Sequence, residues 1–240
     1  QLVRIIQGHH LRSNQYLVVR VYDEDEAKAP WGNAVIKTQG PGTEPPPLPD
    51  LTMGNLLVIR GTAVSFYIPP TGIEVVPDDN GNYVRDAVTL ERLEYAILLD
   101  ENGDKKFLRG PAVVFPNPTE TFVERNGVLK FRAIELNAHS GIFVKVIAPY
   151  TEEDGTARKV GDELFITGRE QMIYFPRPEH AIVRYGEQTI HHAVAIPAGE
   201  ARYVLDRQAG HVRLERGPQI FLPDPRREVI VRRILDRRQV

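Results

Sequence analysis

Apolar residues in this chain occur in short runs, and polar segments containing glycine and proline separate the runs. One arrangement occurs four times: a short apolar run, a glycine, about five further residues, and an aromatic or aliphatic residue followed by proline. The copies span residues 57–70, 107–118, 164–178 and 214–225. Their glycines, Gly61, Gly110, Gly168 and Gly217, are 49, 58 and 49 residues apart. Spacing of this regularity indicates tandem repeats of one structural unit.

A second shared element, an apolar run followed by a charged turn, precedes each glycine. The apolar runs are residues 16–21, 95–99, 142–147 and 201–205, and the turns are residues 23–26, 100–104, 152–155 and 206–210. Asn-Gly and Asp-Gly between apolar runs favour hairpins, because glycine accepts the positive φ angle of a tight turn. The 19 Gly and 19 Pro are spread along the chain and argue against long helices. We therefore predict an all-β fold of small twisted antiparallel sheet modules, about four in a row.

The repeated glycines and prolines are predicted to mark strand ends. Glycine permits a bulge or turn between strands, and proline stops ladder pairing because it has no N–H. The predicted structural positions are Gly61, Pro69, Gly110, Pro116, Gly168, Pro176, Gly217 and Pro223. The predicted modules are residues 1–76, 77–124, 125–183 and 184–230, and residues 231–240 are the start of a further element or a tail.

The first module carries a proline-rich insert at about residues 28–53. Such a run favours an extended, polyproline-like backbone. A loop that wraps its own sheet is our preferred interpretation. The alternative is a segment that docks a partner or a neighbouring subunit.

Charge and composition narrow the function classes. The chain has 30 Lys and Arg against 32 Asp and Glu, a net charge of -2, so no overall field attracts nucleic acid or an anionic membrane. It has no Cys, which excludes disulfides and thiolate chemistry and suits a reducing compartment such as the cytoplasm. No apolar stretch approaches the roughly 20 residues that span a bilayer. Because the chain lacks an initial Met and ends in an apolar and basic run, we expect a segment of a longer polypeptide.

Candidate catalytic and metal-binding residues form no recognisable motif. Neighbours on a strand point to opposite faces, so neither His9–His10 nor His191–His192 is expected to hold one ion. The acidic turns 23–26 and 100–104 lack the EF-hand ligand set and are interpreted as solvated hairpin tips. None of the serines, Ser13, Ser65 and Ser140, lies in a nucleophile elbow, and His139 merely precedes Ser140. We predict no enzymatic activity, no cofactor and no metal.

Six arginines gather near the end of the chain: Arg226, Arg227, Arg232, Arg233, Arg237 and Arg238. They could meet nucleic-acid phosphates. The alternation of residues 228–232 also fits the opening strand of a following repeat, or an interface strand that pairs with an acidic neighbour. We prefer the interface interpretation and do not expect nucleic acid as a partner.

Residues 141–146, 152–155, 160–168 and 174–178 resemble one repeat of the vault repeat family, the repeats of major vault proteins. Residues 108–111, 195–197 and 216–223 are similar to the family's repeats too, and the resemblance is strongest from about residue 86 to 230. Vault repeats are small antiparallel β modules strung end to end, and many copies of the chain stand side by side as the wall of a hollow barrel. The resemblance implies a structural protein that self-associates into a large homo-oligomer. No part of the chain resembles the family's shoulder domain or its long cap helix.

Two other interpretations remain open. One is a structural component of a virion or another large machine, such as a collar, sheath or decoration protein. Dependence of assembly on a different ring or capsid protein would favour it over a vault-like shell. The other is a protein-binding adaptor that displays the insert and the acidic turns, and partner recruitment that depends on residues 28–53 would favour it.

Overall fold

The computed structural model describes residues 6–28, 30–31, 35–36, 49–185 and 187–231 of the 240. These residues are nearly all β and form several small antiparallel sheets, which confirms the prediction of an all-β chain of small sheet modules in tandem. The chain divides into two compact units, Gln1–Arg132 and Ala133–Val240. The strand pairing described below places two modules in each unit.

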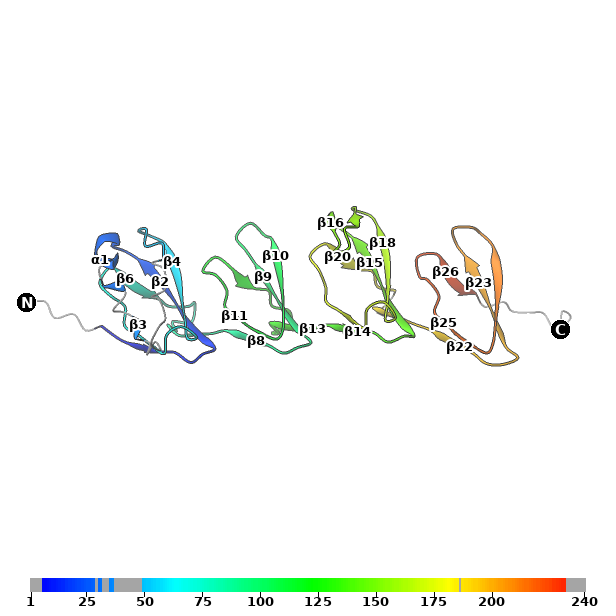
Figure 1. Ribbon diagram of the computed structural model, residues 1–240, viewed down its shortest axis with the longest axis horizontal. Coiled ribbons are helices and arrows are strands. Elements are labelled where there is room, and N and C mark those ends of the chain that lie inside the picture. The colour runs from blue at the N-terminus through cyan, green and yellow to red at the C-terminus, as the bar shows by residue number, and fades with distance from the viewer. Residues whose placement is uncertain (1–5, 29, 32–34, 37–48, 186, 232–240) are drawn as a thin grey trace, which may run out of the picture. The chain divides into compact units, whose positions relative to one another are not determined.

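Each module is organised around one central strand, which pairs with antiparallel neighbours on both sides (Figure 1). The central strands are β2 (Gln15–Val21), β9 (Glu94–Leu99), β15 (Ser140–Val146) and β23 (Ala201–Asp206). On one side lies the strand that ends at the repeat glycine: β4 (Leu56–Arg60), β10 (Lys105–Arg109), β18 (Glu163–Thr167) or β24 (Val212–Arg216). On the other side lies a strand that follows the repeat proline: β6 (Ile73–Val76), β12 (Thr121–Phe122), β20 (His180–Ile182) or β26 (Glu228–Val231).

Short strands complete the modules. In the first three, one more strand pairs with the central strand: β7 (Arg85–Asp86), β13 (Lys130–Arg132) and β21 (Ile190–His192). A small second sheet consists of β1 (His9–His10), β5 (Phe66–Tyr67) and β3 (Val35–Ile36) in the first module. In the others it pairs β8 (Val88–Leu90) with β11 (Ala112–Val114), β14 (Ile134–Glu135) with β19 (Ile173–Tyr174), and β22 (Val194–Ile196) with β25 (Gln219–Phe221).

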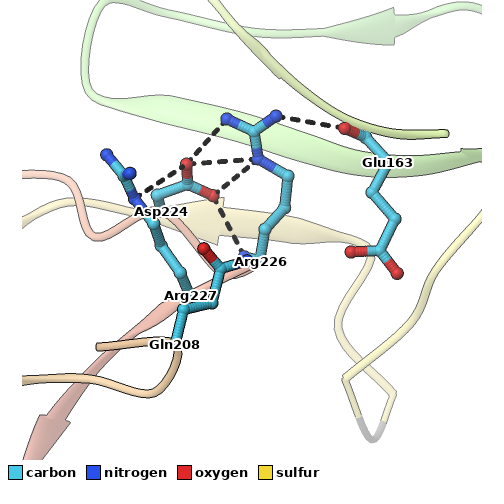
Figure 2. A pocket seen from close by; sticks show the side chains of 5 residues that line it. All are labelled: Glu163, Gln208, Asp224, Arg226 and Arg227. Atoms are coloured by element: carbon cyan, nitrogen blue, oxygen red, sulfur yellow. Dashed lines mark hydrogen bonds and ion pairs between the residues drawn. The ribbon is translucent and has the colours of Figure 1, made fainter. Parts of the chain in front are cut away.

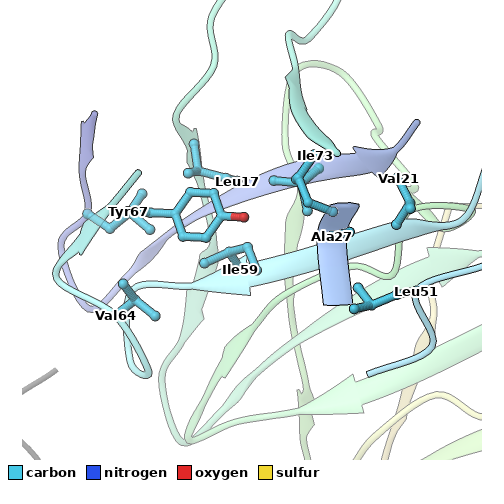
Figure 3. Packing of buried hydrophobic residues seen from close by; sticks show 10 residues of the cluster. Leu17, Val21, Ala27, Leu51, Ile59, Val64, Tyr67 and Ile73 are labelled. Carbon is cyan, nitrogen blue, oxygen red and sulfur yellow. The ribbon is translucent and has the colours of Figure 1, made fainter. Parts of the chain in front are cut away.

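The inward face of each central strand supplies a core, because alternate side chains of a strand point to the same face. In the first module, Leu17, Val21 and Tyr67 are fully buried and belong to one cluster with Leu51 (Figure 3). Separate clusters form in the second module (Leu90, Ala96, Leu98, Val114) and the third (Leu136, Ile142, Val144, Tyr174). In the fourth, Val204 and Ile196 are buried. Each core is small, so each module depends on its neighbours for stability, as is typical of tandem repeats.

The described parts of the insert belong to the first module. Strand β3 pairs with β5, with Val35 opposite Tyr67. Leu51 is buried in the core cluster, and Trp31 packs against that cluster. These contacts fit the interpretation of a loop that wraps its own sheet. Residues 37–48, which hold most of the proline-rich run, lie outside the described residues.

Strand pairing divides the modules later than the predicted boundaries after residues 76, 124 and 183. Strands β7, β13 and β21 follow those boundaries, yet each pairs with the central strand of the preceding module. The physical reason is a reversing turn: Asn126 and Gly127 adopt positive φ angles of 53° and 77° and return β13 to β9. In both units the next module begins almost at once, since one residue separates β7 from β8 and β21 from β22.

The first acidic segment, predicted as a hairpin turn at residues 23–26, is instead helical. Helix α1 (Glu24–Lys28) begins after Asp23, whose Oδ1 accepts a hydrogen bond of 3.1 Å from the backbone N–H of Glu26. Lys28 pairs with Glu24 one turn earlier at 2.7 Å. Aspartate is common both in turns and as the residue that caps a helix. Here Asp23 caps helix α1, and the burial of Ala27 in the core stabilises the helical conformation. The segment 100–104 is a turn, in which Gly103 donates to the carbonyl of Asp100.

The third acidic segment is the tip of an additional hairpin. Strand β16 (Tyr150–Thr151) pairs with β17 (Ala157–Arg158) between β15 and β18. Gly155 has a φ angle of 87°, and its N–H donates to the carbonyl of Glu152. The third module is therefore larger than the second, which accounts for the longer interval between Gly110 and Gly168.

Candidate interaction site

The four repeat glycines occupy equivalent places. A Cβ atom added at Gly61 would lie 1.7 Å from the carbonyl oxygen of Arg12. At Gly110, Gly168 and Gly217 the distances are 1.8, 2.1 and 1.9 Å, to the carbonyl oxygens of Glu91, Asn137 and Pro197. Each glycine N–H donates to the start of its own module, to the carbonyls of Gln15, Glu94, Ser140 and Glu200. Glycine is thus required because two backbone segments touch.

This contact is a second requirement for glycine, beside the predicted position at a strand end. Each repeat glycine directly follows the strand β4, β10, β18 or β24 and lies in a turn or bend. Positive φ angles, which favour glycine for conformational reasons, occur at turn glycines such as Gly103. None of the four repeat glycines has a positive φ angle. Sequence spacing located these positions, but the crossing segment that fills the space beside them is visible only in the folded chain.

The repeat prolines follow the short strands β5, β11, β19 and β25. One residue separates each strand from its proline: Ile68 before Pro69, Phe115 before Pro116, Phe175 before Pro176, and Leu222 before Pro223. Each proline thus stands just past a strand end, where a residue without an N–H does no harm to the ladder. The sequence pattern included the preceding residue only as an aromatic or apolar position, and its contacts were not anticipated.

Phe115 joins the second module to the first. It packs against the face of the first sheet opposite to its core, in a cluster with Tyr16, Val18 and Ala87. The ring centroids of Phe115 and Tyr16 are 6.0 Å apart in an edge-on arrangement, and the Arg60 guanidinium lies 5.3 Å from the Phe115 centroid. Tyr16 and Val18 are consequently only 6% and 4% exposed. We call this contact the module junction.

The second unit has a groove at the corresponding place. Leu222, the counterpart of Phe115, lines a groove together with Phe165 and Thr167 of β18 in the third module. Ile220, Phe221 and Asp224 of the fourth module line the same groove. In both units the apolar residue before the repeat proline thus lies beside the preceding sheet, and in the second unit it lines a groove with that sheet.

Polar contacts strengthen the junction in the second unit. Arg226 donates from Nη1 to the carbonyl oxygen of Glu163 at 3.0 Å, and its Nη2 lies 2.7 Å from Oδ2 of Asp224 (Figure 2). Burial raises the pKa of Asp224, but the hydrogen bonds from Arg226 outweigh it and the pKa lies below its usual value. Asp224 therefore stays ionised and holds the guanidinium against the third module.

The arginines predicted to form an interface differ in their contacts. Arg226 serves the junction within the unit, and Arg227 lies 4.0 Å from Asp224 with 53% of its side chain exposed. Arg232, Arg233, Arg237 and Arg238 lie outside the described residues. The adjoining strand β26 neither opens a following repeat nor stands apart, because it pairs with β23 and closes the fourth sheet. Apolar residues on both faces of a closing strand explain why its pattern resembled a new start.

The histidine pairs and serines considered in the sequence lie apart from one another. His9 is buried and His10 exposed, and His191 is half-buried while His192 is exposed, as alternation along a strand requires. Ser140 is buried, and its hydroxyl lies 2.9 Å from the backbone N–H of Asn137 in a local turn. Within the described residues, no group of three or more His, Asp or Glu is placed to hold a metal ion.

A polar cluster in the third module was not anticipated from the sequence. His180 bridges two tyrosines, with Nδ1 3.0 Å from the Tyr174 hydroxyl and Nε2 2.7 Å from the Tyr150 hydroxyl. Burial lowers the pKa of His180 below the usual 6.5, and the nearby Arg177 lowers it further. The cluster links the β16–β17 hairpin to the core residue Tyr174. No spacing signal could have shown it, because residues 150, 174 and 180 meet only through the sheet.

We expect the third module to lose stability as the pH falls below 6.5. Because the pKa of His180 is lower in the fold than in the unfolded chain, the unfolded chain binds the proton more readily. The contribution is complete above pH 6.5 and is lost on acidification below it. Thermal unfolding at a series of pH values should show a smaller pH dependence for His180→Gln than for the unmodified chain. His192→Gln, at an exposed position of β21, is the control, and an unchanged slope for His180→Gln would contradict the assignment.

Comparison of the chain with protein-family models and with curated proteins gave no match. In the part of the chain that the structure describes, no helix has the length and apolar character needed to cross a membrane. The functional argument therefore depends on the repeated architecture and its surfaces.

Proposed function

We propose that the chain is a non-enzymatic structural protein that associates side by side with copies of itself to form the wall of a large hollow barrel or ring. The carrying observation is that all four main sheets have the same strand order. In the described residues, each of them has at one edge the strand that precedes the repeat glycine, β4, β10, β18 or β24.

An edge strand presents backbone N–H and C=O groups that can pair with another chain. Four edges of the same kind in one chain make lateral contact multivalent, since one paired module brings the next into reach of its partner. Weak contacts at single modules then add up to a stable wall. The resemblance to vault repeats, in which whole chains stand side by side, supports the same arrangement.

Charged side chains on these edges make the pairing selective. Lys105 and Lys106 are exposed on β10, Glu163 on β18 and Arg216 on β24. Charges on an edge strand oppose indiscriminate sheet growth and permit it only where the partner is complementary. We place the assembly in the cytoplasm, because the absence of Cys suits a reducing compartment.

The purified chain alone is expected to form large homomeric hollow particles, which negative-stain imaging and native mass spectrometry would detect. The variant Lys105→Glu should raise the concentration needed for assembly by about tenfold, because it reverses a charge on an edge strand. Arg92→Glu, an equal charge change on an exposed turn, is the matched control. Monomers at every concentration would contradict the proposal, and assembly only on a different ring or capsid protein would favour the virion alternative.

A further inference from the structure

Strand β10 is one edge of the second sheet, and its register shows which of its backbone groups point outward. The carbonyl of Ile97 accepts a hydrogen bond from the N–H of Val123, on the side of β9 away from β10. Ile97 is opposite Phe107, so this pair is one of those without ladder hydrogen bonds. The N–H and C=O groups of Phe107, and of Lys105 two residues earlier, therefore face away from the sheet.

These outward groups have no partner among the described residues, unlike those of the equivalent strand in the third module. On β18, the outward carbonyl of Glu163 accepts a hydrogen bond of 3.0 Å from Arg226. At the other end of β18, the N–H of Thr167 donates to Oε2 of Glu170 at 3.0 Å. The chain thus occupies both ends of the β18 edge and leaves the edge of β10 open.

Exposed basic side chains stand on both faces of β10. Lys105 and Arg109 point to one face, and Lys106 points to the other. The Lys106 side chain is 62% exposed, and its ammonium lies 3.9 Å from the carboxylate of Glu120. In the adjoining turn, the Asp100 carboxylate accepts hydrogen bonds from backbone N–H groups of the turn itself. Lysines on an edge strand oppose the addition of basic strands and favour an acidic one.

We propose that β10 binds an extended acidic segment of a partner protein, which adds to the second sheet as a further strand. The backbone of this segment pairs with the outward N–H and C=O groups of Lys105 and Phe107. Its Asp or Glu side chains lie beside Lys106 on one face and beside Lys105 on the other. Strand addition obtains affinity from main-chain hydrogen bonds and specificity from the side chains that alternate along the added strand.

This binding site goes beyond the lateral association of copies, because it has a different occupant. It also lies inside the chain, since β10 belongs to residues 49–185, which are described without a gap. A neighbouring copy and an acidic segment would compete for the same edge. The experiment must therefore keep the two occupants apart.

Surface plasmon resonance tests the proposal on the full chain, immobilised at low density so that copies stay separate. The probe is a short synthetic peptide in which Glu and Val alternate, and the control peptide has Lys in place of Glu. The acidic peptide should bind at least about tenfold more tightly, and the difference should shrink as added salt screens the charges. N-methylation along both edges of the acidic peptide should abolish its binding, because the ladder can no longer form.

Two substitutions at one position separate the charge from the backbone. Lys105→Gln removes the charge alone and should weaken binding of the acidic peptide several-fold. Lys105→Pro also removes the outward N–H, which an edge strand tolerates, and should weaken binding by about tenfold or more. Lys145→Gln, at an exposed position of the central strand β15, is the matched control and should bind as the unmodified chain does. Far-ultraviolet circular dichroism checks that each variant is folded.

Equal binding of the acidic and basic peptides would overturn the proposal. So would binding to Lys105→Pro as tight as to Lys105→Gln, and the N-methylated peptide decides the same question if Lys105→Pro does not fold. Soluble copies of the chain that bind through Lys105 while the acidic peptide does not would identify a second copy as the occupant. The proposal would then be wrong, although lateral association would stand.

Discussion

Substitution of Gly61 by alanine is expected to lower the free energy of unfolding of the first module by about 3 kcal/mol or more. The added Cβ would lie 1.7 Å from the carbonyl oxygen of Arg12, and the backbone of Gln15 is also within contact distance. Neither neighbour is the flexible end of a side chain, so the strand and the crossing segment must separate. The hydrogen bond of 2.7 Å from the Gly61 N–H to the Gln15 carbonyl would be lost with that separation.

Trp31 offers a direct measurement of this effect. It is the single tryptophan of the chain and packs against the core of the first module, so its fluorescence during urea unfolding reports on that module. Gly54→Asn is the matched control in the same module: Gly54 has a φ angle of 87°, which asparagine tolerates, and a Cβ there meets nothing within 4 Å. Equal losses in the two variants would show that the close backbone contact is not the reason for glycine at position 61.

Phe115→Ala is expected to cost about 2–3 kcal/mol, the lower part of the range for a truncated aromatic because the ring is half-buried. The loss should extend beyond the second module, since Phe115 covers Tyr16 and Val18 of the first. Modules 1 and 2 should then unfold in separate steps, because the interface term that couples neighbouring repeats is removed.

The separation can be seen by comparing Trp31 fluorescence with far-ultraviolet circular dichroism of a fragment of residues 1–132, the compact first unit. Val113→Ala serves as the control: it lies two residues earlier, is 41% exposed, and should change stability by less than about 0.5 kcal/mol. A Phe115→Ala chain that keeps one transition at the original midpoint would mean that the junction does not couple the modules.

The repeats could be predicted because their pattern depends on local requirements. Apolar alternation sets the central strands, and the interval from each glycine to the following proline sets where a strand ends. The module limits were less predictable. Strands β7, β13 and β21 look like the openings of new modules, and only their pairing with β2, β9 and β15 shows that they close the earlier ones. The residues of β26 likewise resemble the start of a new repeat, but the strand pairs with β23 of the fourth module.

The candidate surfaces needed the fold itself. The module junction brings Phe115 against Tyr16, about a hundred residues earlier, and the His180 cluster joins three separate segments. In the same way, Arg226 was predicted as an interface residue, but only the fold shows that it contacts Asp224 and the carbonyl of Glu163 in the neighbouring module. Contacts between residues far apart in sequence cannot be predicted from their spacing, because they depend on the path of every strand between them.

The amino-acid sequence alone determined that the chain is all β, that one sheet unit recurs, and which glycines and prolines mark it. These features follow from backbone preferences and side-chain periodicity, which act over a few residues. The tertiary structure decided why those glycines are needed, where each module ends and which residues join neighbouring modules. These properties depend on contacts between segments that are distant in sequence, and such contacts exist only in the folded chain.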